Sequence, residues 1–434
     1  MKKFVAGCLP LALILGISLI GFPAQAEEED SPAPAEKTSS KSLSERVREL
    51  EKKLSAFEDS AGQKFQQVHE DQLRLHFNVY GDAEYRLFGP SGSFPQSNGF
   101  YIGQTDLHIM GRYGDHLSFM LENVVEFDGQ DPTIDLERIL VSYAFDDKLH
   151  LGAGRDHTSF GYWNRTFHHG AHLQTTIDRP FFIAFEDGGS SGIPAKGGVV
   201  PSHFVGIFAS GTFDLGASAL KYEINLGNNG SIGLDGDGAG NPTNAFINFS
   251  PEGDQFKSKR LAGRLVFKPV SDGGLAIGVA GVLSEYGVLP SDPLMASNSS
   301  LPANMLFTDL AQLLLEGEVI YTDEKVEFLS EFYQFNNAVG GGTTLGSSNN
   351  TAFYIQAGYQ VSPEVKPYVR VENLNVDGTD PFFNALLWSN KTVWLAGIRF
   401  EMVPIASSLK MEARSINDSG VTSTELATAW GYGF

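Results

Sequence analysis

The sequence has few of the features on which soluble and nucleic-acid-binding proteins depend. Its only cysteine is Cys8, which excludes a disulfide framework and a thiolate metal site. The 31 basic residues are outnumbered by 52 acidic ones, and this imbalance argues against nucleic acid as a partner, because phosphate contacts need clustered Lys and Arg. Only 19% of the residues are charged, whereas 12% are aromatic. We therefore expect a chain that is neither disordered nor an ordinary soluble protein.

The N-terminus carries the three parts of a secretory signal peptide. Lys2 and Lys3 precede an apolar run over residues 4–22, and Ala24-Gln25-Ala26 comes directly before the acidic residues 27–30. This pattern predicts cleavage after Ala26, with a signal peptide over 1–26 and export from the cytoplasm. A retained membrane anchor is the competing interpretation, which the cleavage motif and acidic flank disfavour. No later apolar run reaches the 18 or so residues of a transmembrane helix.

A linker and a short helix are expected next. Residues 27–42, "EEEDSPAPAEKTSSKS", are acidic and rich in Pro, Ala and Ser, which is typical of a solvated linker. Ser42 and Glu45 fit a capping box. Apolar residues then recur at spacings of 4 and 3, at positions 43, 47, 50, 54, 57 and 61, which predicts a short periplasmic coiled-coil helix over 43–70. With fewer than three heptads it needs partner chains or a docking surface; the alternative is a helix lying on its own domain.

From Leu73 onward the hydrophobic period is 2. In "LRLHFNVYGDAEYRL", residues 73–87, the odd positions are apolar or small and the even positions are polar or charged. Successive residues of a strand point to opposite faces, so one face is apolar and the other charged. Strands of soluble sandwiches are usually about five or six residues long, which makes this pattern too long for one.

Similar segments recur through the rest of the chain. We count 16 of them, starting near residues 73, 99, 117, 134, 149, 201, 215, 259, 274, 309, 326, 351, 365, 390, 408 and 423. Short connections of a few residues alternate with longer ones at 89–98, 128–133, 158–200, 227–258, 287–308, 336–350, 376–389 and 416–422. An even number of antiparallel strands with short periplasmic turns and long outer loops is the bacterial outer-membrane design. The fold prediction is thus an all-β, 16-stranded antiparallel transmembrane β-barrel over 73–434, placed in the bacterial outer membrane and in contact with its lipids.

The chain ends on "LATAWGYGF", with bulky residues on one parity and small ones on the other. In a closed barrel the last strand pairs with the first, so this end is expected to be ordered. A terminal Phe of this kind resembles the signal by which outer-membrane barrels reach the barrel assembly machinery. The predicted assembly signal is Trp430, Tyr432 and Phe434.

The inward parity of the predicted strands is charged. In barrels of about 16 strands the inward faces no longer meet, which leaves an aqueous channel. A dry core would not tolerate so many charges, which disfavours a soluble β-protein with a packed interior. The candidate lumen-wall residues are Arg74, Asp82, Glu84, Arg86, Arg112, Glu122, Glu126, Glu316, Glu318, Glu327, Glu331, Arg370, Arg399 and Arg414.

Residues 158–200 form the longest connection, the third outer loop, hereafter loop 3. Its many aromatic residues predict packing against the barrel wall and a constriction of the pore. The candidate constriction residues are Arg155, His157, Arg165, His168, His169, His172 and Arg179. The "HHGAH" motif suits a metal only if it is helical, which Gly170 disfavours, and no further ligand can be named; we predict neither a metal nor another cofactor.

Four stretches carry a family resemblance: "LERILVSYAFDDKLHLGAGRDHTSFGYWN" at 136–164, "VKPYVRVENLNV" at 365–376, the "LAGIRF" to "LKMEARS" hairpin at 395–415, and the terminal Phe434. Over 73–434 the chain resembles the phosphate-selective (porin O/P) family of outer-membrane porins. The resemblance implies a homotrimer and diffusion through a pore that loop 3 narrows. Phosphate selectivity in that family implies a ladder of arginines and a lysine-rich constriction, whereas loop 3 has only Arg165, Arg179 and Lys196.

The functional prediction is a porin without enzymatic activity that passes small hydrophilic solutes or ions by passive diffusion, with the solute undetermined. One alternative is a structural or adhesive barrel that its coiled coil tethers to the envelope. A second is an outer-membrane enzyme, for which Ser159 near His157 is the one nucleophile and base pair to be named, without an orienting third group.

Overall fold

The computed structural model describes residues 48–49, 52–53, 73–89, 98–127, 132–167, 172–183, 198–236, 242–249, 251, 253, 258–288, 309–339, 350–386, 388–403 and 406–434. The chain divides into two compact units, 1–67 and 68–434. In the first unit the four described residues are helical, and Lys53 Nζ lies 3.4 Å from Glu49 Oε1. The predicted signal peptide, linker and apolar heptad positions lie outside the described residues.

In the second unit most of the described residues lie in strands. Their bounds are β1 Leu73–Phe88, β2 Gly99–Tyr113, β3 Leu117–Phe127, β4 Pro132–Asp146, β5 Leu149–His157, β6 His203–Asp214, β7 Ala219–Gly227, β8 Gly230–Gly236, β9 Pro242–Asn248, β10 Arg260–Lys268, β11 Leu275–Val288, β12 Asp309–Thr322, β13 Val326–Val339, β14 Asn350–Tyr359, β15 Val365–Asn375, β16 Lys391–Val403, β17 Ser407–Asp418 and β18 Val421–Gly433. Among the described residues of the outer connections, three short segments are helical: α2 Tyr162–Phe167, η1 Phe181–Ile183 and α4 Pro381–Ala385.

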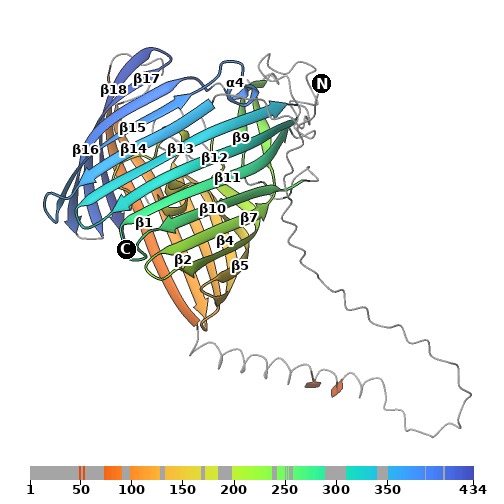
Figure 1. The fold of residues 1–434 in the computed structure, drawn as a ribbon. Helices are drawn as coiled ribbons and strands as arrows, with labels where there is room; N and C mark the ends of the chain where they lie inside the picture. The colour runs from red at the N-terminus through yellow and green to blue at the C-terminus, as the bar shows by residue number, and fades with distance from the viewer. Residues whose placement is uncertain are drawn as a thin grey trace, which may run out of the picture. The chain divides into compact units, whose positions relative to one another are not determined.

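Sixteen of the described strands close into an antiparallel barrel (Figure 1). Strands β1 to β7 pair in sequence, β7 pairs with β10, and β10 to β18 continue the order until β18 pairs with β1. The last residue takes part in this closure, because Phe434 N donates to Val79 O and Val79 N donates to Phe434 O, both at 2.9 Å. The predicted closure and strand number are confirmed.

Three outer connections differ from the sequence prediction. The stretch 227–258 contains an additional hairpin, β8–β9, whose first strand pairs in parallel with the end of β11. The connection after β15 contains α4, which begins as a helix should, with Asp380 as N-cap and Pro381 in the first turn. The predicted loop 416–422 is wrong: β17 and β18 are joined by Ser419 and Gly420 alone, both at positive φ, as in the tight turns that match strand twist.

The two faces of the barrel are the reverse of those in a soluble protein. On the outer face Phe77 and Trp394 are 60% and 62% exposed, whereas Arg86 and Glu331 on the inner face are 0% exposed. Soluble proteins bury their large apolar residues and leave charges in water. An outward apolar face over a polar interior is the arrangement that a lipid environment favours. None of the described helices is long and apolar enough to cross a membrane.

Candidate functional site

Loop 3 leaves β5 and turns into the barrel at a point fixed by its neighbours. Thr158 N donates to Ser202 O (2.8 Å), and Asn164 Nδ2 donates to both Thr158 O (3.3 Å) and Ser202 O (3.0 Å), which ties the two ends of the loop together. Gly161 has a φ of +70°, and a Cβ there would lie 2.8 Å from Glu331 Oε1. This turn therefore requires glycine, both for its backbone conformation and for its close approach to β13.

The short helix α2 docks on the inner face of β13 and β14. Glu331 accepts hydrogen bonds from the backbone N–H groups of Tyr162 and Trp163, which are otherwise without partners at a helix start. The Trp163 ring is fully buried, packs edge-on against Tyr354 at 5.5 Å, and lies 5.3 Å from the Arg370 guanidinium. Burial is also the main reason that the pKa of Tyr162 rises to about 12.

Asp178 joins loop 3 to two arginines of the wall. Arg86 forms a bidentate pair with it, Nη2 to Oδ1 at 2.8 Å and Nη1 to Oδ2 at 3.0 Å, and Arg414 Nη1 also donates to Oδ2. Burial raises the pKa of Asp178, but Arg414 and Arg86 outweigh that effect and hold it well below its usual range. The Asp178 side chain is therefore an ionised anchor at neutral pH.

Further Arg and Lys side chains of the barrel wall donate hydrogen bonds to backbone carbonyl groups of loop 3. Arg399 Nη1 donates to His172 O (2.7 Å) and Gln174 O (2.6 Å). Lys410 Nζ donates to Thr176 O (2.8 Å), and Arg370 Nη2 to Asp178 O (2.9 Å). Charged donors form stronger hydrogen bonds than neutral ones, so these contacts hold the loop backbone firmly.

Glutamate side chains of the barrel wall accept hydrogen bonds from backbone N–H groups of the same loop. Glu412 accepts from Ile177 N (2.6 Å), and Glu372 accepts from Phe181 N (2.7 Å). Many inward charges are thus engaged by loop 3, with bases on its carbonyls and acids on its N–H groups.

The bare face of β18 receives the middle of loop 3. Ile177 forms a small buried cluster with Ala427 and Ala429. His172 lies over Gly431, where a Cβ would come within 3.0 Å of His172 Cα, and Ser408 Oγ lies 3.2 Å from His172 Nδ1. The small residues at the end of the chain leave the space that this loop occupies.

An aromatic cluster holds the far end of loop 3 and the helix α4. Phe181 stacks on Trp388, and Phe182 packs edge-on against Tyr333. The residues of α4 join the same core through Phe382 and Phe383. Asp380, which caps α4, also accepts from Asn337 and Asn350 of the wall.

The remaining candidate constriction residues lie at the edge of this assembly. Arg155 Nε donates to Glu137 O (2.9 Å), and the buried His157 ring lies 5.1 Å from the His203 ring. Arg165 Nη1 donates to His157 O (2.7 Å). Arg179 is half-buried. His168 and His169 lie outside the described residues, as does the side chain of Glu126.

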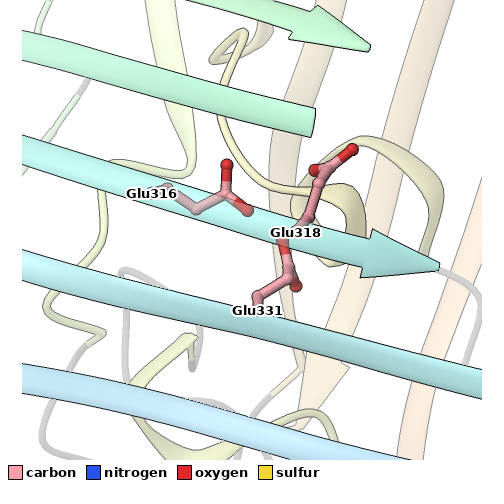
Figure 2. Close-up of side chains that lie close together, drawn as sticks. All are labelled: Glu316, Glu318 and Glu331. Carbon is pink, nitrogen blue, oxygen red and sulfur yellow. The ribbon is translucent and has the colours of Figure 1, made fainter. Parts of the chain in front are cut away.

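The lumen-wall candidates that do not donate to loop 3 lie at several places on the wall. Arg74 and Arg112 are exposed at the end of the barrel that carries the short turns, where Arg112 Nη2 donates to Asp115 O (2.9 Å). Glu122 pairs with Arg138 on the wall. Glu84 is buried beside Arg86, one of the two arginines that hold Asp178, and Asp82 is buried on the same strand. The carboxylates of Glu316, Glu318 and Glu331 converge (Figure 2), with ligand oxygens that lie within 4.8 Å of one another.

Several site residues were not singled out from the sequence. Ile177 and Asp178 carry anchoring contacts of loop 3, and Lys410 and Glu412 hold it from β17. Their partners are about 90 to 240 residues away in the chain, so no local pattern could have identified the pairs. The signal for α4 was present in "DPFF" at 380–383, an N-cap Asp followed by Pro.

No protein-family model and no curated protein matches the sequence. The structure is similar to the anion-selective porin from Comamonas acidovorans, with a TM-score of 0.55, 10% identity, and coverage of 84% of this chain and 100% of that one. It is also similar to the outer-membrane channel DcaP of Acinetobacter baumannii, with a TM-score of 0.50, 9% identity, and coverage of 84% and 98%. OmpT, an outer-membrane protein of Vibrio cholerae, gives a TM-score of 0.50 at 10% identity, with coverage of 84% and 98%. The fold is that of a porin-type outer-membrane barrel; the resemblance to the phosphate-selective family stays a prediction.

Proposed function

We propose that this protein is an outer-membrane porin that passes small hydrophilic solutes and ions by passive diffusion. The observation that carries the proposal is the closed barrel with an apolar outer face and a charged inner face, in which loop 3 is held by wall charges. A barrel of this strand number is wide enough to keep water between its inner faces. Loop 3 is then the constriction that limits solute size.

The exposed charge along one side of the barrel favours anions. In the pair of Lys221 and Glu223 the lysine side chain is 49% exposed and the glutamate 5%, and in the pair of Arg165 and Asp156 the values are 24% and 9%. A passing ion interacts most strongly with charges that face water. In the pair of Arg86 and Asp178 the acidic side chain is instead the more exposed one. The proposed anion preference is therefore modest.

The assembly proposed for this porin is a homotrimer. One structure of OmpT to which this chain is similar, with a TM-score of 0.50, is described as a trimer form. Cross-linking of the purified protein in mild detergent, followed by measurement of its mass, tests this assembly separately from conduction.

Conduction is tested with purified protein in planar lipid bilayers. Stepwise insertions with an ohmic current–voltage relation are expected. A correctly folded barrel that inserts but carries no current would refute the proposed function, and the matched measurement is the same protein heat-denatured before addition.

A further inference from the structure

Three glutamates meet on the inner face of β12 and β13 (Figure 2). Glu316 and Glu318 occupy successive inward positions of β12, and Glu331 lies directly opposite Glu318 in the β12–β13 register. Their exposed fractions are 5%, 2% and 0%. One carboxylate oxygen of each lies within 4.8 Å of those of the other two.

Two of these carboxylates have evident partners. Both oxygens of Glu318 accept from Arg264, Oε1 from Nη2 at 2.6 Å and Oε2 from Nε at 3.1 Å. The same arginine is shared with Glu223, to which Nη1 donates at 3.0 Å. Glu331 accepts from the two backbone N–H groups at the start of α2.

Glu316 differs from both. Its Oε1 and Oε2 are each buried and have no hydrogen-bond partner among the described residues. Leaving a buried carboxylate without a partner is costly, and two neighbouring carboxylates increase that cost. The cluster of three glutamates therefore lacks a positive charge next to the Glu316 carboxylate.

The chemistry of the donors indicates what supplies that charge. All three side chains offer only oxygen ligands. Hard divalent cations such as Ca²⁺ and Mg²⁺ prefer oxygen, whereas zinc and copper sites usually contain nitrogen or sulfur ligands. Bonds from Ca²⁺ to oxygen measure about 2.3–2.6 Å, so oxygens within 4.8 Å of one another can share one ion. Mg²⁺ bonds of about 2.0–2.1 Å and its strict octahedral geometry fit less well.

We propose that Glu316, Glu318 and Glu331 form a binding site for one divalent cation, with Ca²⁺ preferred over Mg²⁺. The ion neutralises Glu316 and links β12 to β13. Glu331, its ligand on β13, also holds the start of α2. This proposal does not depend on whether the barrel conducts, because its test measures Ca²⁺ binding and not current.

The test uses the full-length mature protein in detergent, stripped with a chelator and titrated with Ca²⁺ by calorimetry. One Ca²⁺ per chain is expected, together with a rise in the unfolding temperature, since a ligand that binds the folded state stabilises it. Tb³⁺ should bind the same site and give luminescence sensitised by Trp163, whose backbone N–H donates to Glu331, and Ca²⁺ should quench it by displacement.

The decisive variant is Glu316→Gln, which keeps the shape and removes the unpartnered charge; at least a tenfold loss of Ca²⁺ affinity is expected. The matched control is Glu327→Gln, on an inward position of β13, the strand that also carries Glu331. Glu327 lies outside the cluster, and its partners are Thr175 of loop 3, Lys366 and Gln356. It should bind Ca²⁺ as the wild type does. Both variants are checked for β-sheet content by circular dichroism.

Two results would overturn the proposal. One is a wild-type protein that shows neither heat nor stabilisation with millimolar Ca²⁺, which would mean that Glu316 carries a proton instead of facing a metal. The other is a Glu316→Gln variant that folds and binds Ca²⁺ and Tb³⁺ as tightly as the wild type.

Discussion

At the scale of single residues, Asp178 connects loop 3 to Arg86 and Arg414, two buried cations of the barrel wall. Removing one member of a buried ion pair leaves the other charge without compensation. Here Glu84 and Glu425 also contact Arg86, which limits the loss. The anchor therefore contributes to the position of loop 3 more than to the existence of the barrel.

Asp178→Asn should lower the free energy of unfolding by about 1–3 kcal/mol, because charged hydrogen bonds are replaced by neutral ones. It should also raise the single-channel conductance, because loop 3 is held less tightly. Thermal unfolding in detergent and bilayer recordings measure the two effects. Asp272→Asn, at an exposed turn position between β10 and β11, is the control and should change neither.

The pH dependence follows from the same carboxylate. The pKa of Asp178 is lower in the folded protein than in the unfolded chain, so its contribution is complete above about pH 4 and is lost as the pH falls through the folded value. The difference in unfolding temperature between wild type and Asp178→Asn should thus be constant from pH 7 to pH 5. It should shrink toward strongly acidic pH; a difference that grows on acidification would contradict this sign.

At the scale of secondary structure, β18 closes the barrel with its backbone and seats loop 3 with its inner face. Its outward residues alternate with Ala427, Ala429, Gly431 and Gly433, against which Ile177 and His172 pack. A larger side chain on the inner face of β18 would have to displace loop 3. A larger side chain on the outer face would contact only the lipid or detergent around the barrel.

Ala429→Leu should therefore destabilise the protein by about 1–3 kcal/mol through overpacking and should increase conductance or current noise. Thr428→Leu places the same side chain on the outer face of β18 and should leave both properties close to wild type. Equal effects of the two substitutions would mean that Ile177 does not rest on β18. Unfolding temperature and bilayer current are the measurements.

The elements of the barrel were predictable because a period of 2 over long segments depends only on neighbouring residues. The chain 416–422, "INDSGVT", resembles a loop because most of its residues are polar or small, although Gly420 completes a two-residue hairpin turn. The packing of loop 3 was predictable in kind from its aromatic residues. Its partners were not, because pairs such as Ile177 and Glu412 are fixed by barrel closure and not by local sequence.

At the scale of the whole molecule, the net charge is negative, whereas the exposed charge of two inward ion pairs is positive. The formal net charge is −21, yet in the pairs of Lys221 with Glu223 and of Arg165 with Asp156 the basic member is the more exposed one. Selectivity in a narrow channel depends on the charges that line it and not on the total.

In a salt gradient the reversal potential should therefore show a modest preference for anions. Lys221→Gln should shift it toward cations, because it removes an exposed charge and leaves Glu223 in place. Lys325→Gln, in the exposed turn between β12 and β13, should shift it less. A cation-selective wild-type channel would refute the proposed preference while leaving the porin itself intact.

The central claim is that loop 3 lies inside the barrel against β18 and narrows the channel there. Because the chain has no cysteine beyond Cys8, a single pair can be introduced as His172→Cys with Gly431→Cys, where a Cβ built at Gly431 lies 3.2 Å from His172 Cβ. That is close to the separation of about 3.5–4.5 Å in disulfides. Mild oxidation of the folded protein should give a linked pair of peptides by mass spectrometry, and His172→Cys with Thr428→Cys should not. Two thiols that remain free in a folded His172→Cys/Gly431→Cys barrel would contradict the account.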